Sequence, residues 1–503
     1  MNLRNLALYG LGGIVLTGSW YYRDELANLT GIARSTPEAP FTSASPAAAS
    51  TPAEEGVRIV AIDHGSLYTG TLPPSTPISK EHDGSGRKVV EMLTPEEATK
   101  KLRRNEESYN VNRGRGVFRY DVVQIPSNDP IEDDHAEKII EVPSTVAAAD
   151  GAANSDWMFW GVFDGHSGWT TSAKLRQVLI GFVAHELNAT YKSAITDPAL
   201  KTPAPEAIDE AIKKAFLKLD KEIVIDSVEK VFANPSKLIA AETLAPALSG
   251  SCALLAFYES RSKMLRVAVT GDSRAVLGRR GKNGKWTATA LSEDQTGSTA
   301  SEETRIRKEH PGEANVIRNG RVLGGLEPTR AFGDASYKWT ADVQAKIKDK
   351  FFGRTPSSLL KTPPYVTAEP VVTTTKIEPE NGDFVVMATD GLWEMLTNEE
   401  VVGLVGKWME EQKGPQGNGW FGGWFGGKKK DVLPIEGVAE GDKNGQRAPI
   451  RVRQWGLDKE DERFVCEDKN VATHIVRNAL GGKNSDMLCA LLTLPSPYSR
   501  RYR

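Results

Sequence analysis

A short apolar run that ends in a polar turn, WMFWGVFDGHSGW at residues 157–169, constrains the fold of this chain most strongly. Its first half, 157–163, is rich in aromatic residues and too short for a free-standing helix, so it predicts a buried strand. From Trp169 onward the apolar residues recur at helical spacing. Asp164 and His166 therefore lie where a buried strand ends and a helix begins.

Asp164 needs an explanation, because an ionised carboxylate beside an apolar strand is costly unless it is paired, hydrogen-bonded or bound to a metal. Asp-Gly is also a common turn pair, so this dipeptide alone would indicate only a turn. A second copy of the pattern favours a metal site: the apolar run 383–389, DFVVMAT, leads directly into Asp390 and Gly391. Two carboxylates at strand ends can converge on one cation, and Mg²⁺ or Mn²⁺ prefer such oxygen ligands.

Composition places the chain among globular proteins and excludes several classes of function. With 503 residues and 39% hydrophobic content it can bury a sizeable core, and a net charge of -3 gives no basic excess that would indicate a nucleic-acid partner. Cys252, Cys466 and Cys489 lie far apart, which argues against a disulfide framework and a zinc cluster. None of them has an arginine six residues later, and no Asp-x-Asp-x-Thr or Gly-x-Ser-x-Gly motif occurs. Cysteine, aspartyl and serine nucleophiles are therefore not indicated.

The amino end differs from the rest of the chain. Residues 5–22 carry no charge, and an aromatic Trp-Tyr-Tyr cluster closes this stretch like an interfacial belt. We expect 1–34 to be a targeting segment, either a membrane anchor with a transmembrane helix at 5–22 or a mitochondrial targeting sequence. A cleaved signal peptide is the rival interpretation. Residues 35–56 are too poor in large apolar side chains to bury a core, so they predict a disordered linker.

A lead-in region is predicted at 57–115, and it contains one clear helix start. Thr94 fits an N-cap, Pro95 fits the first helical position and Glu97 completes a capping box. These signals predict a helix at 94–108.

The main domain is expected to extend from 116 to 503. A strand at 116–125 leads into an acidic loop that contains Glu132 and Asp133. Asn283-Gly284 predicts a two-residue hairpin turn, because both residues tolerate a positive φ. Between about 408 and 462 the pattern becomes rich in Gly, Trp and Lys, which indicates an insertion. Further helices and strands are predicted at 208–223, 249–257, 264–270, 274–278, 286–291 and, as the final helix, 470–480.

The chemistry that these residues favour is phosphoryl transfer. Two divalent ions a few ångströms apart can activate a water and hold a phosphoryl group for in-line displacement. Asp164 can bridge both ions, the carbonyl of Gly165 can add a ligand, and Asp390 can close the site from a neighbouring strand. His166 is placed to protonate the leaving oxygen as a general acid.

Five short motifs in one order now make a family resemblance specific. They are DGHSG at 164–168, SGSCA at 249–253, GDSRAV at 271–276, TRAFGD at 329–334 and DGLWE at 390–394. Over roughly residues 93–503 the chain resembles the metal-dependent protein phosphatases of the PPM (type 2C) family. The resemblance implies an α+β fold in which two mainly antiparallel β-sheets pack between layers of α-helices. It also implies a serine/threonine phosphatase that hydrolyses phosphoserine and phosphothreonine with a metal-activated water.

The same resemblance implies roles for individual residues. Asp164 and His166 match the catalytic positions, and two Mg²⁺ or Mn²⁺ ions are expected. Asn128 stands where the family usually has a phosphate-binding arginine, so we assign it to the phosphate site. The implied metal ligands are Asp164, Gly165, Asp390, Asp133 and Glu132, with Asp272 and Glu394 at the position of a weaker third ion.

Two features suggest a branch of the family and an incomplete end. The sequences 128–133 and 93–106 look like the pyruvate dehydrogenase phosphatase branch, which implies a mitochondrial location and a phosphoprotein substrate, with pyruvate dehydrogenase as a candidate. In the family, an Asp-Asp pair and a last core strand follow the segment that matches 485–503, and the first of those Asp residues binds metal. We therefore expect this strand to be missing and activity to be reduced. The alternative is a catalytically weak or dead phosphatase fold that serves as a binding or scaffold module.

Overall fold

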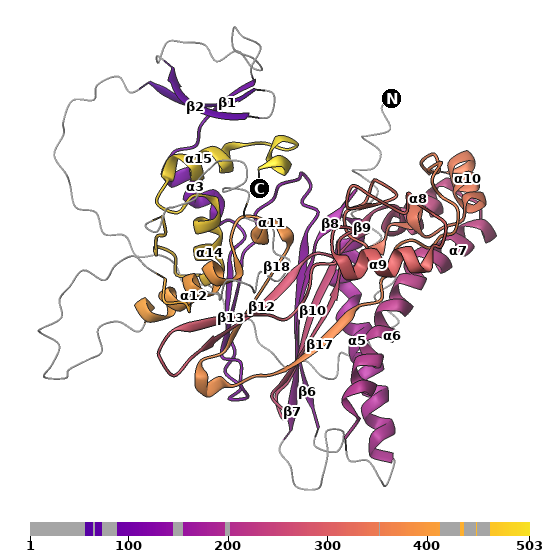
Figure 1. The fold of residues 1–503 in the computed structure, drawn as a ribbon, viewed down its shortest axis with the longest axis horizontal. Helices are drawn as coiled ribbons and strands as arrows, with labels where there is room; N and C mark the ends of the chain where they lie inside the picture. The colour runs from indigo at the N-terminus through magenta and orange to yellow at the C-terminus, as the bar shows by residue number, and fades with distance from the viewer. Residues whose placement is uncertain are drawn as a thin grey trace, which may run out of the picture. The chain divides into compact units, whose positions relative to one another are not determined.

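The structure is a computed structural model, shown in Figure 1. It describes residues 56–63, 66–72, 88–143, 154–196, 202–351, 353–412, 433–436, 449 and 463–502. The targeting segment expected at 1–34, with its transmembrane helix at 5–22, lies outside these residues, as does the linker expected at 35–56 except for Gly56. Among the helices that are described, none combines the length and apolarity needed to cross a bilayer.

An antiparallel five-stranded sheet forms the centre of the described chain (Figure 1). Its strands lie in the order β17 (Val371–Lys376), β11 (Met264–Thr270), β10 (Ala253–Glu259), β7 (Ser155–Phe163) and β6 (Asp134–Val142). The apolar run 157–163 lies in β7, which pairs with β10 on one side and β6 on the other. The prediction of a buried strand there is confirmed.

A second antiparallel sheet contains β13 (Trp286–Ala290), β12 (Arg274–Arg280) and β18 (Phe384–Ala388) in that order. The hairpin predicted between β12 and β13 is present, but its loop has five residues, because Arg280 pairs with Trp286. Gly281 N–H donates to Lys285 O at 2.8 Å, and Gly284 takes a φ of +81°. The prediction of a two-residue turn was therefore wrong, although the left-handed glycine is used.

Alternation along the strands explains why residues 157–163 of β7 and 253–258 of β10 are apolar. In β7, Trp157 and Phe159 face one apolar cluster and Met158 faces another. In β10, Leu255 faces the first of these clusters and Leu254 faces the second. Successive side chains of a strand point to opposite faces, so a strand with two covered faces must be apolar at every position.

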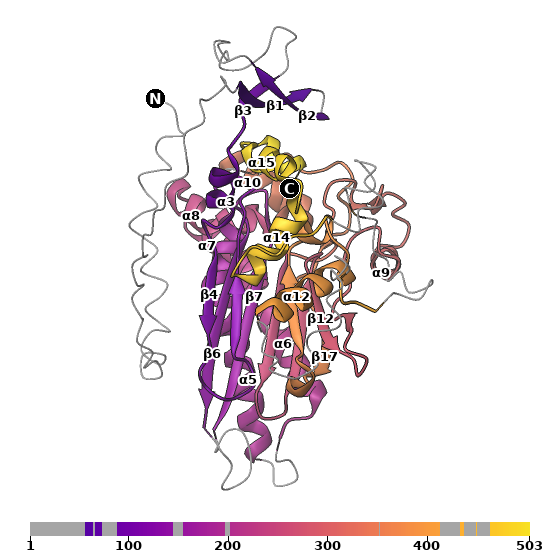
Figure 2. The same ribbon diagram turned by 90° about the vertical axis from the view of Figure 1, so that its left-hand side faces the viewer.

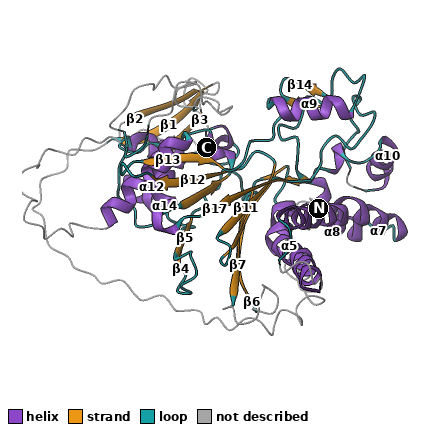
Figure 3. Cartoon of the chain, turned by 60° about the horizontal axis from the view of Figure 1, so that its bottom comes forward, coloured by secondary structure: helices purple, strands orange, loops and turns teal. Residues whose placement is uncertain are grey.

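Helices cover the outer faces of both sheets, as Figures 2 and 3 show. The five-stranded sheet is covered by α5 (Thr170–Thr196), α6 (Pro205–Lys221), α7 (Ser227–Ala233) and α8 (Lys237–Leu248). The three-stranded sheet packs against α12 (Asn398–Gln412) and α14 (Val471–Leu480). The predicted fold class, α+β with two antiparallel sheets between helical layers, is confirmed. No strand follows β18 among the described residues.

The lead-in region forms a small sheet and a helix. The sheet contains β2 (Ser66–Leu72), β1 (Val57–Asp63) and β3 (Lys88–Glu91) in that order. Helix α3 (Pro95–Leu102) packs against α15 (Ser485–Thr493) in one apolar cluster that also includes Val60. Because α15 follows α14, the expectation that 470–480 would be the final helix was wrong.

The helix predicted at 94–108 starts as expected but ends earlier. Thr94 Oγ1 accepts a hydrogen bond from Glu97 N–H at 3.2 Å, and Glu97 Oε2 accepts one from Thr94 N–H at 2.9 Å, which completes the capping box. The helix stops at Leu102, because residues 107–110 are drawn into strand β4 (Glu107–Asn110), which pairs with β5 (Arg119–Val122). The strand predicted at 116–125 is thus shorter too.

The range 408–462, where an insertion is predicted, overlaps the end of helix α12. Helix α12 continues to Gln412, and Trp408 is buried, with its Nε1–H donating to Asp468 O at 2.9 Å. The described residues 433–436 lie beside β13, where Trp286 N–H donates to Pro434 O at 2.9 Å and Glu436 N–H donates to Trp286 O at 2.9 Å. The rest of 413–462, except residue 449, lies outside the described residues.

Candidate active site

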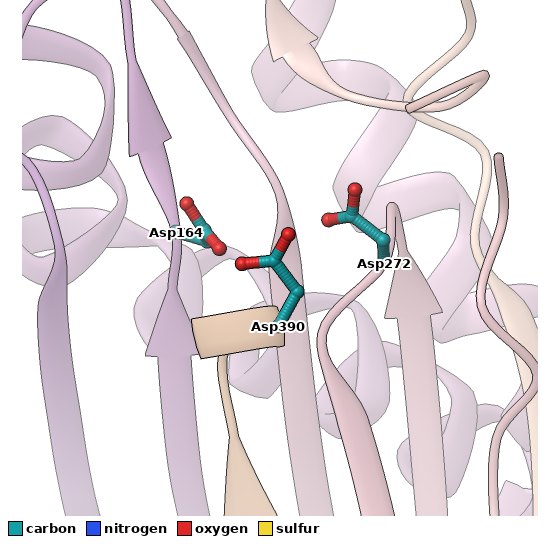
Figure 4. A group of neighbouring side chains, drawn as sticks. All are labelled: Asp164, Asp272 and Asp390. Atoms are coloured by element: carbon teal, nitrogen blue, oxygen red, sulfur yellow. The ribbon is translucent and has the colours of Figure 1, made fainter. Parts of the chain in front are cut away.

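Three aspartates from separate chain segments meet at one end of the sandwich (Figure 4). Asp164 follows β7, Asp272 lies between β11 and β12, and Asp390 opens the short helix α11 (Asp390–Trp393). One carboxylate oxygen from each lies within 4.8 Å of the others. The structure thus brings Asp164 and Asp390 together, as the sequence predicted, and places Asp272, the residue expected beside a weaker third ion, in the same group.

Strand register explains why these carboxylates converge. Strands β6 and β7 pair with Asp134 opposite Phe163, so Asp133 and Asp164 leave the sheet side by side. Strands β12 and β18 pair with Arg274 opposite Ala388, so Asp272 and Asp390 come together in the same way. Each carboxylate lies just beyond the end of a strand, where the antiparallel pairing fixes its position.

Burial and mutual repulsion raise the pKa values of these aspartates. Burial raises the pKa of Asp164 well above its usual value, and the charges of Asp133, Asp390 and Asp272 raise it further. Burial also raises the pKa of Asp133, to about 6, and of Asp390, where the charge of Asp272 adds to it. Among the described residues, no lysine or arginine forms an ion pair with the three clustered aspartates. Carboxylates held together in this way favour the binding of a cation.

The predicted ligand Gly165 and the acidic loop are in direct contact. Gly165 N–H donates to Asp133 Oδ1 at 3.3 Å. A Cβ atom at Gly165 would lie 2.0 Å from the backbone oxygen of Glu132, so only glycine fits there. Asn128 Nδ2 donates to Glu132 Oε2 at 2.6 Å, which shows that this amide holds the acidic loop.

The two predicted ligands of a third ion differ in their placement. Asp272 belongs to the aspartate cluster, and Cys252 Sγ donates to its Oδ1 at 3.2 Å. Glu394 caps the end of α11, where its N–H donates to Asp390 O at 2.8 Å. Its carboxylate is not part of the three-aspartate group, although its charge contributes to the raised pKa of Asp390.

His166 is held by an aspartate whose role the sequence analysis did not predict. His166 Nε2 and Asp334 Oδ2 lie 2.6 Å apart. Burial lowers the pKa of His166, but the charge and hydrogen bond of Asp334 outweigh burial, so the pKa is raised above its usual value. The imidazole is therefore favoured in its protonated form.

A sheet of three two-residue strands brings His166 and Asp334 together. It contains β16 (Phe332–Gly333), β9 (Gly250–Ser251) and β8 (Gly165–His166) in that order. Gly250 pairs with His166 on one side and with Gly333 on the other. A Cβ atom at Gly250 would lie 2.2 Å from both His166 Nε2 and Asp334 Oδ2, so glycine makes room for this pair.

Asp334 and Cys252 were missed as functional residues, although both lie within motifs that carry the family resemblance. The signal for Asp334 was an acidic residue directly after the apolar-Gly pair Phe332-Gly333. It takes a left-handed φ of 47°, which Asp tolerates better than most residues. For Cys252 the sequence held no signal, because a lone cysteine in an apolar strand is usually a packing residue.

A cavity of about 1020 Å³ opens beside the aspartate cluster. Its walls come from β5, β6, β7 and β18, and from the helices α12 and α14. Site residues that line it are Asn128, Glu132, Asp133, Asp164, Gly165, His166, Asp390 and Glu394. A substrate in this cavity can therefore reach both the acidic cluster and the imidazole.

Comparisons with known proteins agree with this site. The family model described as protein phosphatase 2C matches residues 129–417. A Saccharomyces cerevisiae protein named "[Pyruvate dehydrogenase [acetyl-transferring]]-phosphatase 1, mitochondrial" is 44% identical over 453 residues, which cover 86% of this chain and 75% of that protein. A Schizosaccharomyces pombe protein phosphatase 2C homolog is 43% identical over 80% of this chain and 82% of its own length. The human protein with the same name as the Saccharomyces cerevisiae one is 30% identical over 82% of this chain and 81% of its own length.

These matches extend across the acidic loop, the aspartate cluster and the histidine. They favour the enzyme over the alternative of a dead phosphatase fold that serves as a scaffold. The chain belongs to the protein phosphatase 2C family and is a metal-dependent protein serine/threonine phosphatase.

Proposed function

We propose that this protein removes the phosphoryl group from phosphoserine or phosphothreonine on pyruvate dehydrogenase in mitochondria. The observation that carries the proposal is the meeting of Asp164, Asp272 and Asp390 within 4.8 Å, without a basic partner among the described residues. The names of the relatives from Saccharomyces cerevisiae and human both state a mitochondrial phosphatase of pyruvate dehydrogenase. Those names support the substrate and the location.

The residues present fit a pair of Mg²⁺ or Mn²⁺ ions. Their donors are carboxylate and carbonyl oxygens, which hard divalent cations prefer over nitrogen or sulfur. Asp164 is close enough to Asp133, Asp390 and Asp272 for their charges to raise its pKa, so its carboxylate would contribute to holding both ions. Asp133, the carbonyl of Gly165 and Glu132 would hold one ion, and Asp390 with Asp272 would hold the other. Bound ions supply charge neutralisation for the phosphoryl group and lower the pKa of a water.

His166 acts as the general acid in this proposal. Its Nε2 is committed to Asp334 Oδ2, which leaves the Nδ1 proton for the leaving oxygen of serine or threonine. The raised pKa favours retention of that proton until the P–O bond breaks. Asp334 is thus a positioning residue that also sustains the charge of the imidazolium.

The test is release of phosphate from a phosphoserine peptide and from phosphorylated pyruvate dehydrogenase, with and without Mn²⁺. We expect Mn²⁺-dependent release by the wild-type chain and a loss of roughly 1000-fold or more in Asp164→Ala, because a bridging carboxylate is worth several kcal/mol to the transition state. Asp342→Ala, an exposed acid in α10 (Ala341–Lys350), is the matched control and should retain full activity.

Two outcomes would contradict the proposal. One is a wild-type chain that releases no phosphate at any Mn²⁺ concentration although its melting transition is cooperative. The other is an Asp164→Ala variant as active as Asp342→Ala. Release from the peptide but not from pyruvate dehydrogenase would reject the named substrate alone.

A further inference from the structure

We propose that Arg500 is the residue that binds the phosphate of the substrate. Arg500 lies in the short 3-10 turn η6 (Tyr498–Arg501), near the carboxyl end of the chain and far in sequence from the aspartates. The inference rests on the proposed function and names the cationic contact that the acidic loop itself lacks.

The turn that carries Arg500 is held beside the acidic loop. Ser499 is buried, and its Oγ donates to the backbone oxygen of Ser127 at 2.6 Å. This bond fixes η6 against the residue that precedes Asn128. Arg500, Ser127 and Asn128 line the same cavity as Asp164, and the Asn128–Glu132 hydrogen bond continues the contact toward Gly165. Arg500 therefore shares a cavity wall with the acidic loop, beside which the phosphate would be held.

The acidic site needs a further positive charge to bind a phosphate dianion. A phosphate dianion that enters the cavity meets Glu132, Asp133, Asp164 and Asp390, and divalent ions at those ligands would be largely offset by the carboxylates themselves. Asn128, the residue that the sequence placed at the phosphate site, carries no charge, and its amide already donates to Glu132. A cation from elsewhere in the chain would complete the site.

The other arginines near the site are already paired with aspartates. Of the described residues that line the cavity, two are arginines and none is a lysine. Arg119 is committed to Asp121 through two hydrogen bonds of 2.9 Å each and lies over the ring of Trp408. Arg176, close to the acidic loop but not in the cavity wall, pairs with Asp134 at 3.1 Å.

Arg500 differs from both of these arginines. It is exposed, and among the described residues its guanidinium has no ion pair or hydrogen bond. Its planar fork of N–H donors matches two phosphate oxygens at once, which a lysine ammonium cannot do. The side chain therefore combines the charge, the geometry and the availability that the phosphate requires.

The experiment measures binding of inorganic phosphate to the Mn²⁺-loaded full chain by calorimetry, together with kcat and KM for a phosphoserine peptide. We expect Arg500→Ala to bind phosphate roughly 10- to 100-fold more weakly and to lose a similar factor in kcat/KM, because charged bidentate contacts contribute at that level. Arg500→Lys should recover part of the loss. Mn²⁺ affinity should stay unchanged in both variants, since Arg500 contacts no proposed ligand.

Arg501→Ala is the matched control, because Arg501 is the adjacent exposed arginine and does not line the cavity. It should leave phosphate binding and kcat/KM unchanged. Equal phosphate affinity in wild type and Arg500→Ala, an equal loss in Arg501→Ala, or no phosphate binding by the wild type would overturn the inference. If the wild type binds phosphate through Arg500 but turns over no phosphopeptide, the proposed function fails and the binding role of Arg500 stands.

Discussion

Two regions of this molecule bury carboxylates in opposite ways. At the active site, Asp164 faces other aspartates, and its pKa is raised by burial and by their charges. In helix α9 (Ala300–Glu309), Glu302 is buried, but Arg330 Nη2 donates to it at 2.7 Å and Arg305 Nη2 at 2.6 Å. Burial would raise the pKa of Glu302, yet the hydrogen bonds from Arg330 and Arg305 outweigh burial and lower the pKa to about 2.

The difference teaches that burial alone does not make a functional site. Glu302 is fully satisfied by Arg330, Arg305 and the hydroxyl of Thr329, so nothing else needs to bind there. The aspartate cluster has no lysine or arginine partner among the described residues, so a cation from solution is needed to offset its charge. A buried carboxylate paired within the chain holds the fold, whereas unpaired carboxylates that face one another mark a cation site.

The largest effect is expected from breaking the aspartate cluster at Asp390. Asp390→Asn should lower kcat/KM for a phosphoserine peptide by about 1000-fold, because one negatively charged ligand is lost. The free energy of unfolding without metal should stay level or rise, because the charge repulsion with Asp272 is removed. Glu206→Gln, at an exposed acid of α6, is the control and should change neither quantity.

Removing the buried carboxylate of Glu302 should lower the free energy of unfolding rather than the catalytic rate. Glu302→Ala leaves the buried guanidinium of Arg330 without its partner, so we expect a loss of about 3–5 kcal/mol in the free energy of unfolding. Urea titration measures the loss, and calorimetry should find Mn²⁺ affinity unchanged in the protein that remains folded. A stable Glu302→Ala variant with weakened Mn²⁺ binding would show that Glu302 serves the metal site rather than the fold.

Added Mn²⁺ should stabilise the folded protein through the aspartate cluster and not through Glu302. At a Mn²⁺ concentration of about 100 Kd, wild type should gain about 2.7 kcal/mol in the free energy of unfolding per site. Glu302→Gln should keep this gain, measured relative to its own metal-free state, and Asp164→Asn should lose most of it. Thermal melting with Mn²⁺ and with EDTA gives the comparison, and an equal gain in Asp164→Asn would show that the ion binds elsewhere.

The smallest effect is a difference in pH dependence. Without metal, the pKa of Asp133 is about 6 in the folded chain against an ordinary value of 3.8, so the folded state binds this proton more tightly. Its contribution to stability is therefore largest below about pH 3.8 and is lost as the pH rises through about 6. Glu302, at about 2 against 4.5, contributes stability above about pH 4.5 and loses it as the pH falls through 2.

Urea titrations between pH 4 and pH 8 in EDTA should show a stability contribution from Asp133 that falls as the pH rises and a contribution from Glu302 that stays nearly constant above about pH 4.5. Asp133→Asn should be more stable than wild type at pH 7 and nearly equal to it at pH 4. Glu302→Gln should be less stable than wild type by a constant amount above pH 5. A difference between Asp133→Asn and wild type that does not change with pH would show that Asp133 is not perturbed by its surroundings.

Much of this site could be predicted because it lies at strand ends. Asp164 and Asp390 each follow a short apolar run, and such runs have few structural alternatives to a buried strand. The partner of His166 could not be predicted, because Asp334 reaches it through β9, and pairing between distant two-residue strands leaves no periodic signal. The early end of α3 was missed for a similar reason, since residues 107–110 follow their strand partner rather than their helical tendency.

The sheet formed by β8, β9 and β16 has a consequence for when the enzyme becomes active. Its strands come from three widely separated parts of the chain, and each contributes only two residues. Such a sheet cannot persist by itself, because closing the long intervening loops costs more entropy than a few hydrogen bonds return. A ribosome-bound fragment or a partly unfolded molecule would therefore lack the proton donor. The fold therefore couples phosphatase activity to the completion of folding, because His166 and Asp334 pair only after all three strands have come together.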